Sequence, residues 1–301
     1  MECCNVGATS RLSIGGTRMD FIDFMPERFM KTLSDGSKQS IRGTLDHNSL
    51  SVGEGMLFVE FRISMYMTAL KLDTLLPILG LTETPTDTFT LGDVLTPTTI
   101  ILGPKASPEQ VYGNAICGRW VISGQKGMEP VKLTMWFRAK TVTEQVVNTT
   151  FTNQTTPPLV EGYPYSFTNG SMNLYGAARF FNQFQLGMDY GLIDEFNNSV
   201  TATNICPTDH ALTIGTSVLY SSCDNNTDLW TLPLSGSVVG STFTLNFDRT
   251  DVGKSTHFSV GNVKLLARPP QVVKPDFLRL PIHGQGYALG TAPLLIATNV
   301  A

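Results

Sequence analysis

The sequence predicts a mainly β protein: an antiparallel β-sandwich flanked by one short helix. Apolar and polar residues alternate with period two in several segments, while only one segment has helical spacing. Charged residues make up only 15% of the chain, against a usual share of about 25%. Because few charges suit a protein that buries its sides against copies of itself, we expect self-assembly.

The clearest alternation runs from Leu57 to Met67 and predicts a strand about 30 Å long or more. The apolar residues of this segment share one face, and Glu60, Arg62 and Ser64 lie on the other. Shorter alternating segments lie at 131–138, 183–188, 242–247 and 278–282. One polar and one apolar face per strand is typical of antiparallel sheets packed as a sandwich.

One helix is predicted after the long strand. Thr68 can cap its start, and leucines at 72, 75, 76 and 79 recur at helical spacing. Pro77 removes one internal hydrogen bond, and Gly80 can end the segment, so the helix is short or bends there.

The chain divides into two β-rich halves in this prediction. Residues 142–172 are rich in Thr, Asn, Pro and Tyr and form a linker or long loop between residues 1–150 and 151–301. The first half carries the long strand, the helix and a projecting arm. Residues 120–137 faintly resemble 263–282, which leaves an internal duplication open.

The projecting arm is predicted just before the long strand, where a polar segment is punctuated by glycines. Its alternative is a mobile surface loop. The candidate arm residues are Arg42, Gly43, Thr44, Asp46, His47, Asn48 and Glu54.

No catalytic, metal or cofactor site is predicted, and we expect the protein not to be an enzyme. The four histidines are dispersed, the five cysteines form no C-x-x-C pair, and Asp209-His210 has no G-x-S-x-G partner. The net charge of −4 argues against a tight grip on nucleic acid. No apolar run reaches about 20 residues, and the start lacks a signal-peptide pattern, so neither a membrane nor secretion is expected.

Several motifs in order give a resemblance. The first half has Ile41-Arg42-Gly43-Thr44, then the long strand, then L-D-T-L-L-P-I-L-G at 72–80. The second half has F-Q-L at 184–186, F-N-N-S at 196–199 and P-T-D at 207–209. From about Phe21 to Leu289 the chain resembles the major tail tube proteins of long-tailed, siphovirus-like bacteriophages. It departs from them at Glu60-Phe61, where the family often has Gly-Gly, and in having fewer arginines in the preceding loop.

The resemblance implies a structural virion protein, made in the host cytoplasm, whose rings stack into the tail tube through which the genome is delivered. In proteins of this family the strands of neighbouring β-sandwiches join into a continuous, barrel-forming sheet around a central channel. Each ring holds six such sandwiches, supplied by six subunits or by three subunits with duplicated domains. Glu60, Arg62 and Ser64 would line the channel, and the arm would touch the next ring. The implied partners are further copies, a tape-measure protein, and tail terminator and distal tail proteins.

The sequence leaves two properties of the implied channel open: the charge of its wall and the pairing of Glu60 and Arg62. Six copies at −4 give −24 per ring and three give −12, which would repel phosphate if the acidic groups face inward. The alternative for Glu60 and Arg62 is an ordinary cross-strand ion pair on a solvent face.

Two other functions compete with the tube. One is another virion β-sandwich: a tail terminator, a neck protein or a capsid decoration protein. The other is a carbohydrate-binding or hydrolytic β-sandwich with Trp120, Trp136 and Trp230 as a stacking platform.

Overall fold

The computed structural model describes residues 10–35, 52–104, 108–127, 130–145, 150–151, 159–197, 199–219, 229, 241–266, 271–274, 277–288 and 292–301. Within these ranges the protein is mainly β, with one α-helix, α1 (Ala69–Leu75), and one 3-10 turn, Phe167–Asn169. The strands are β1 (Arg11–Ile14), β2 (Thr17–Met19), β3 (Asp23–Asp35), β4 (Val52–Tyr66), β5 (Leu81–Glu83), β6 (Thr88–Leu91), β7 (Thr98–Gly103), β8 (Glu109–Gln125), β9 (Lys132–Ala139), β10 (Thr141–Gln145), β11 (Leu159–Val160), β12 (Gly170–Leu174), β13 (Ala177–Ala178), β14 (Phe181–Asp189), β15 (Ile193–Glu195), β16 (Asn204–Cys206), β17 (Ala211–Leu219), β18 (Ser241–Arg249), β19 (Lys254–Leu266), β20 (Gln271–Lys274), β21 (Phe277–Tyr287) and β22 (Leu295–Val300).

The largest layer is an antiparallel sheet of eight described strands, here called the first sheet. Its order is β3-β4-β9-β8-β14-β17-β21-β20. Strands β8 and β14 pair in register, with Trp120 opposite Met188. The two halves of the sequence, 1–150 and 151–301, therefore share one sheet.

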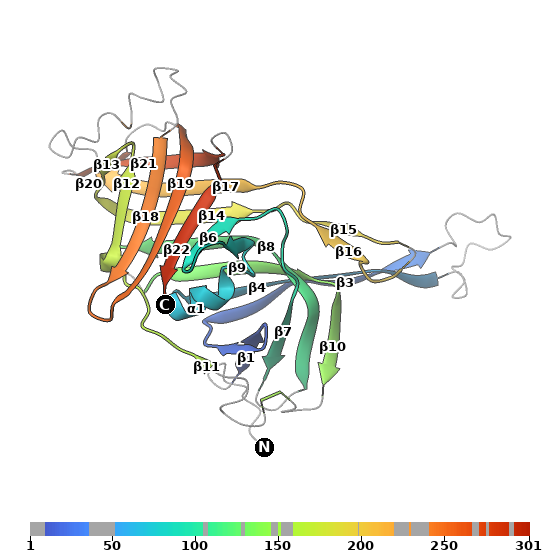
Figure 1. Ribbon diagram of the computed structural model, residues 1–301. Coiled ribbons are helices and arrows are strands. Elements are labelled where there is room, and N and C mark those ends of the chain that lie inside the picture. Colours follow the sequence, from blue (N-terminus) through green and yellow to red (C-terminus); the bar gives the residue numbers. More distant parts are fainter. Residues whose placement is uncertain are drawn as a thin grey trace.

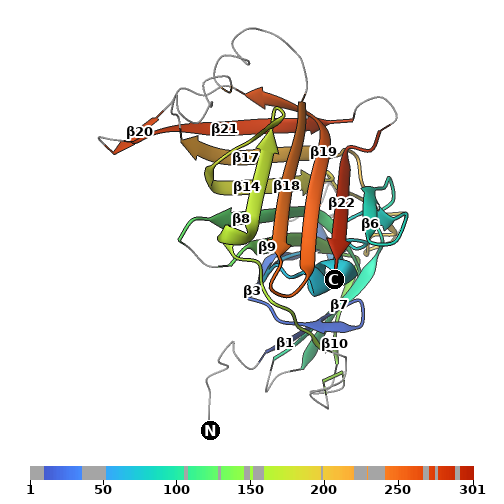
Figure 2. The same cartoon turned by 60° about the vertical axis from the view of Figure 1, so that its left-hand side comes forward.

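A second layer covers the apolar side of the first sheet. Its order is β13-β12-β18-β19-β22-β6-β5, and its strands run across those of the first sheet (Figures 1 and 2). The end of β19 turns to pair with β21, so the two layers join at that corner. A β-sandwich whose layers cross and meet at a corner is the arrangement that follows.

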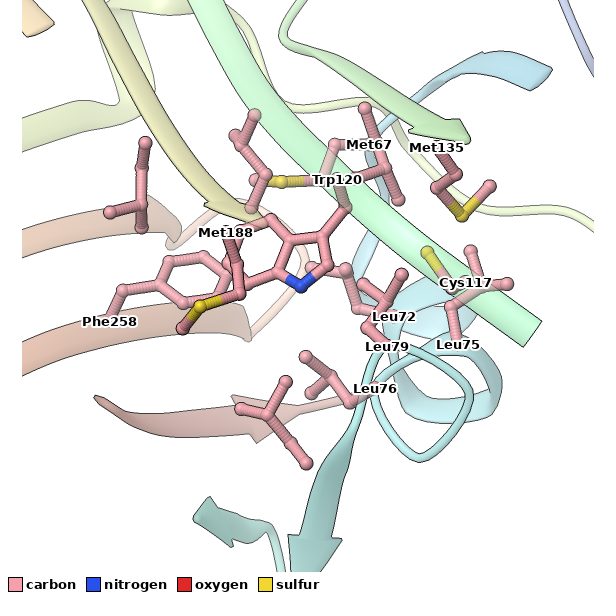
Figure 3. Packing of buried hydrophobic residues seen from close by; sticks show 14 of the residues in the cluster. Met67, Leu72, Leu75, Leu76, Leu79, Cys117, Trp120, Met135, Met188 and Phe258 are labelled. Carbon is pink, nitrogen blue, oxygen red and sulfur yellow. The ribbon is translucent and has the colours of Figure 1, made fainter. Parts of the chain in front are cut away.

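The core lies between these layers. Trp120 of β8, Met188 of β14 and Phe258 of β19 meet there, together with leucines of α1 (Figure 3). The predicted apolar face is confirmed from Val59 in β4 to Met67 just after it, where every second side chain is at most 2% exposed, and Leu57 at its start is partly buried. Period-two burial is the direct result of the pleat, which sends alternate side chains to opposite sides.

Strand β8 also builds a third, smaller sheet. Its first residues pair with β7 and β10, and β7 continues to β1, β2 and the parallel strand β11. Asn114 adopts a positive φ of 49° where β8 leaves one sheet for the other. Asn accepts this left-handed geometry more readily than most residues, which lets one strand serve two sheets.

The helix follows its predicted signals. The Thr68 hydroxyl accepts a hydrogen bond from the Lys71 amide at 3.1 Å, and the helix stops before Pro77. Gly80 then turns the chain at a φ of +88°, where an added Cβ would lie 2.7 Å from the hydroxyl of Tyr190. Among the described residues, no helix is long and apolar enough to span a bilayer.

Strands β3 and β4 form a long hairpin that projects from the sandwich (Figure 1). At the far end of its described part, Asp35 pairs with Val52. Glu54 lies on β4 opposite Leu33. The candidate arm residues from Arg42 to Asn48 lie outside the described residues, so the arm stays a prediction.

Candidate assembly face

The side of the first sheet that points away from the core is polar, and we call it the polar face. It follows from the register, because residues opposite each other in neighbouring strands share a face. Its described members are Asp23, Arg28, Glu60, Arg62, Ser64, Arg119, Ser123, Gln125, Lys132, Thr134, Trp136, Arg138, Gln183, Gln185, Asp189, Thr213, Ser217, Arg279, His283 and Gln285.

Glu60 belongs to a cluster of three charges on this face. Its Oε1 lies 2.5 Å from Nη2 of Arg138, directly opposite on β9, and Arg138 Nη1 lies 3.4 Å from Oδ2 of Asp194. The side chains of Glu60 and Arg138 are about one quarter exposed, and that of Asp194 is 7% exposed. Burial raises the pKa of Asp194, an effect that the nearby Arg138 partly offsets.

Arg62 pairs with the edge strand rather than with Glu60. Its Nη2 lies 3.7 Å from Oδ2 of Asp23 and 3.5 Å from the sulfur of Met25. The ion pairs on this part of the face are therefore cross-strand pairs, as in the alternative interpretation of the sequence. Glu60 and Arg62 do not pair with each other, because Glu60 pairs with Arg138 and Arg62 with Asp23.

Ser64 is on the same face but is covered in the single chain. Its side chain is 1% exposed, and its hydroxyl lies 3.4 Å from that of Thr134. In this structure Glu60 and Arg62 reach the solvent and Ser64 does not.

The tryptophans do not form a common platform. Trp120 is fully buried, and its indole N–H donates to the hydroxyl of Tyr190 at 3.4 Å. Trp136 is on the polar face, where it donates to Glu27 at 3.0 Å and lies under the Arg119 guanidinium at 4.9 Å. Trp230 lies outside the described residues. The burial of Trp120 removes one ring from the proposed sugar-binding platform.

The part of the polar face formed by β14, β17 and β21 carries amides and hydroxyls. A hollow of about 370 Å³ lies over it, lined by Gln125, Gln183, Gln185 and His283 among others.

Acidic and basic groups nearly balance over the whole described face: Arg28, Arg62, Arg119, Lys132, Arg138 and Arg279 against Asp23, Glu27, Glu60, Asp189 and Asp194. The net negative charge of the chain is thus not concentrated here.

The two edges of the first sheet differ in length. β3 has a strand partner on one side only within the described part of the chain, and so does β20 at the other edge. Pro26 in β3 has no N–H to donate, which suits an edge strand, and the pairing with β4 shifts register beside it. Open edges of this kind offer unpaired backbone groups to another chain.

A further element lies over the base of the long hairpin and was not foreseen from the sequence. The β15–β16 hairpin with its connecting residues, here called the strap, contacts β4 through a hydrogen bond from the Leu57 amide to the Val200 carbonyl at 2.8 Å. Phe196 packs edge-on against Phe58, with ring centroids 5.4 Å apart. Arg138 of β9 fastens the start of the strap to the sheet, because its guanidinium donates a hydrogen bond to the carbonyl of Leu192, just before β15, at 2.8 Å.

The groups that suggest chemistry in the sequence are separated in space. Among the described residues no three His, Cys, Asp or Glu side chains group as metal ligands. Burial raises the pKa of the Cys117 thiol to about 12. The ring of His210 packs edge-on against Tyr190, and the Asp209 carboxylate accepts from the His210 backbone amide, not from its ring.

No family model matches the chain, and no curated protein is significantly similar to it.

Proposed function

We propose that this protein is a tail tube subunit that closes into rings, and that the rings stack into a conduit for the phage genome. The observation that carries the proposal is the first sheet: eight strands with one polar face and an open strand at each edge. The virion tail is then its location, and its own copies are its main partners.

Edge pairing supplies the driving force for closure. If β3 of one copy lies beside β20 of the next, the unpaired backbone groups of β20 and of the facing part of β3 find partners. The first sheets of the copies then join into one closed barrel. The low charge of the chain suits subunits whose sides are covered in this way.

Sheet width favours three copies per ring. Three sheets of eight give 24 strands, and with spacings of about 4.8 Å and a tilt of about 40° the barrel is about 48 Å across. Where the strap does not cover the polar face, side chains reaching about 5 Å inward leave a bore of roughly 38 Å, which admits a DNA duplex. Six copies would double the diameter to about 96 Å, far wider than one duplex needs.

The polar face suits a lumen through which a polyanion slides. Four of its basic groups are paired with acids or stacked on rings: Arg62 with Asp23, Arg138 with Glu60, Arg28 on Phe58 and Arg119 on Trp136. Tight binding of DNA would require unpaired cations that release counterions. A nearly neutral, hydrogen-bonding wall neither holds the genome nor repels it strongly.

The tape-measure protein would occupy the same bore before DNA, and the terminator and distal proteins would cap its ends.

Negative-stain electron microscopy of the purified protein tests the proposal. We expect rings and tubes, with three copies per ring by native mass spectrometry of the rings. Single rings that never stack would favour a terminator or neck protein instead. A protein that stays monomeric at high concentration would contradict the proposal.

The arm has a separate test. Deleting residues 44–52 should leave folded subunits that form rings but no tubes. Normal tubes from that deletion would contradict an inter-ring role for the arm.

A further inference from the structure

One end of strand β14 carries an exposed apolar groove. The groove has a volume of about 660 Å³, and its lining includes Phe167, Met172, Phe180, Phe181 and Lys126. Phe180 is 75% exposed, although its neighbour Phe181 packs edge-on against Phe167 with ring centroids 5.0 Å apart. We call this site the β13 groove, because β13 forms its rim.

The other end of β14 leads into the strap. Ile193 is 55% exposed and Val200 is 39% exposed, and the carboxylate-bearing Glu195 beside them is also exposed. The strap is held in place by Arg138 and by the Leu57 backbone, so its exposed apolar side chains are presented in one arrangement. Such pre-organisation lowers the entropy that is lost on binding.

The groove is lined by residues at the start of β14, and the strap follows its end. Strands β13 and β15 accordingly lie at opposite ends of β14 (Figure 1). Nine residues of β14 separate them, which corresponds to about 27 Å. In the proposed ring the sheet edges are used for closure, so the strand ends face the neighbouring rings. A contact between two different ends of one molecule is heterologous and repeats without closing, which produces a filament.

We propose that the strap of each subunit docks in the β13 groove of a subunit in the next ring. Ile193 and Val200 pack against Phe180, and Glu195 lies near Lys126 of the groove. Opposite charge at the two ends favours this orientation over contacts between like ends. The inference rests on the proposed function, because it describes how the rings stack.

Two variants separate the two ends. Phe180→Asp disables the groove and leaves the strap intact, whereas Ile193→Asp disables the strap and leaves the groove intact. Both residues are exposed, so neither change is expected to alter folding, which circular dichroism verifies. Each variant alone should form rings and lose tubes by electron microscopy.

A mixture of preformed rings of the two variants gives the sharper result. The intact strap of Phe180→Asp rings fits the intact groove of Ile193→Asp rings, and all other ends are disabled. We expect double rings and no tubes. Val94→Asp, at a side chain that is 78% exposed in the β6–β7 connection, is the matched control and should form normal tubes.

A charge exchange tests the same contact without touching the apolar residues. Lys126→Glu and Glu195→Lys should each reduce tube formation, and the chain carrying both should recover it, because each interface then holds a reversed pair.

The outcomes are distinct. Normal tubes from both Asp variants would overturn the inference and leave the tail tube proposal intact. Folded Asp variants that fail even to form rings would also overturn it, because these residues would then act in ring closure. Failure of the unmodified protein to form rings would instead refute the proposed function.

Discussion

The two parts of the polar face share one backbone sheet but differ in chemistry. The part on β3, β4, β9 and β8 is ion-paired, with Arg138 between Glu60 and Asp194. The part on β14, β17 and β21 carries mainly amides and hydroxyls, with Gln183 and Gln185 at its centre and the charges of Asp189 and Arg279 at its borders. The strap crosses only the first part, where the ion cluster of Arg138 fastens it to the sheet.

This difference indicates where the stability of the face resides. A partly covered ion cluster leaves unpaired charge behind when one member is removed, whereas an exposed amide can exchange its partner for water. Changes in the ion-paired part should therefore cost more than changes in the amide part.

The largest effect is expected for Arg138→Ala. The change leaves the carboxylates of Glu60 and Asp194 close together without the cation that they share and frees the strap from β9. Because these groups are partly solvated, we expect a loss of about 2 kcal/mol, below the roughly 3–5 kcal/mol of a fully buried pair. Urea unfolding monitored by tryptophan fluorescence measures it.

Gln185→Ala is the matched change in the amide part. It should alter the free energy of unfolding by less than about 0.5 kcal/mol, as is usual for exposed positions. Equal losses from the two variants would contradict the division of the face.

The strands and the helix were predictable because their signals are local. The alternation from Leu57 to Met67 fixes two faces without reference to the rest of the chain. Thr68 and Pro77 mark the start and end of α1 in the same way. These elements are confirmed by the structure.

The features that were not predictable depend on partners distant in sequence. Ser64 has the same place in the pattern as Glu60 and Arg62, and its burial comes from neighbouring strands. The strap lacks alternation, and its partner Arg138 lies more than 50 residues earlier. Asn114 carries no signal that distinguishes the point where β8 changes sheets.

An intermediate effect is expected for Trp136→Phe. The aromatic ring under Arg119 remains, but the hydrogen bond to Glu27 is lost. This bond is solvent-exposed, so we expect a loss of about 0.5 kcal/mol in the free energy of unfolding. Urea unfolding measures the difference from the natural protein. No change would show that the hydrogen bond to Glu27 adds nothing to the stability of the face.

The smallest effect concerns pH and the strap. The pKa of Asp194 is raised in the folded state, chiefly by burial. The folded protein therefore binds a proton at Asp194 more readily than the unfolded chain does. The resulting contribution to stability is present below the pKa of the unfolded chain and is lost as the pH rises through the folded pKa. Asp194→Asn carries no such proton, so the stability of the natural protein relative to this variant should increase as the pH is lowered from neutrality towards about 4. Urea unfolding at a series of pH values measures the difference, with Asp189→Asn, at the end of β14 just before the strap, as the control. A difference that grows as the pH rises would show that Arg138 outweighs burial at Asp194, and that the strap is fastened by its ion pair.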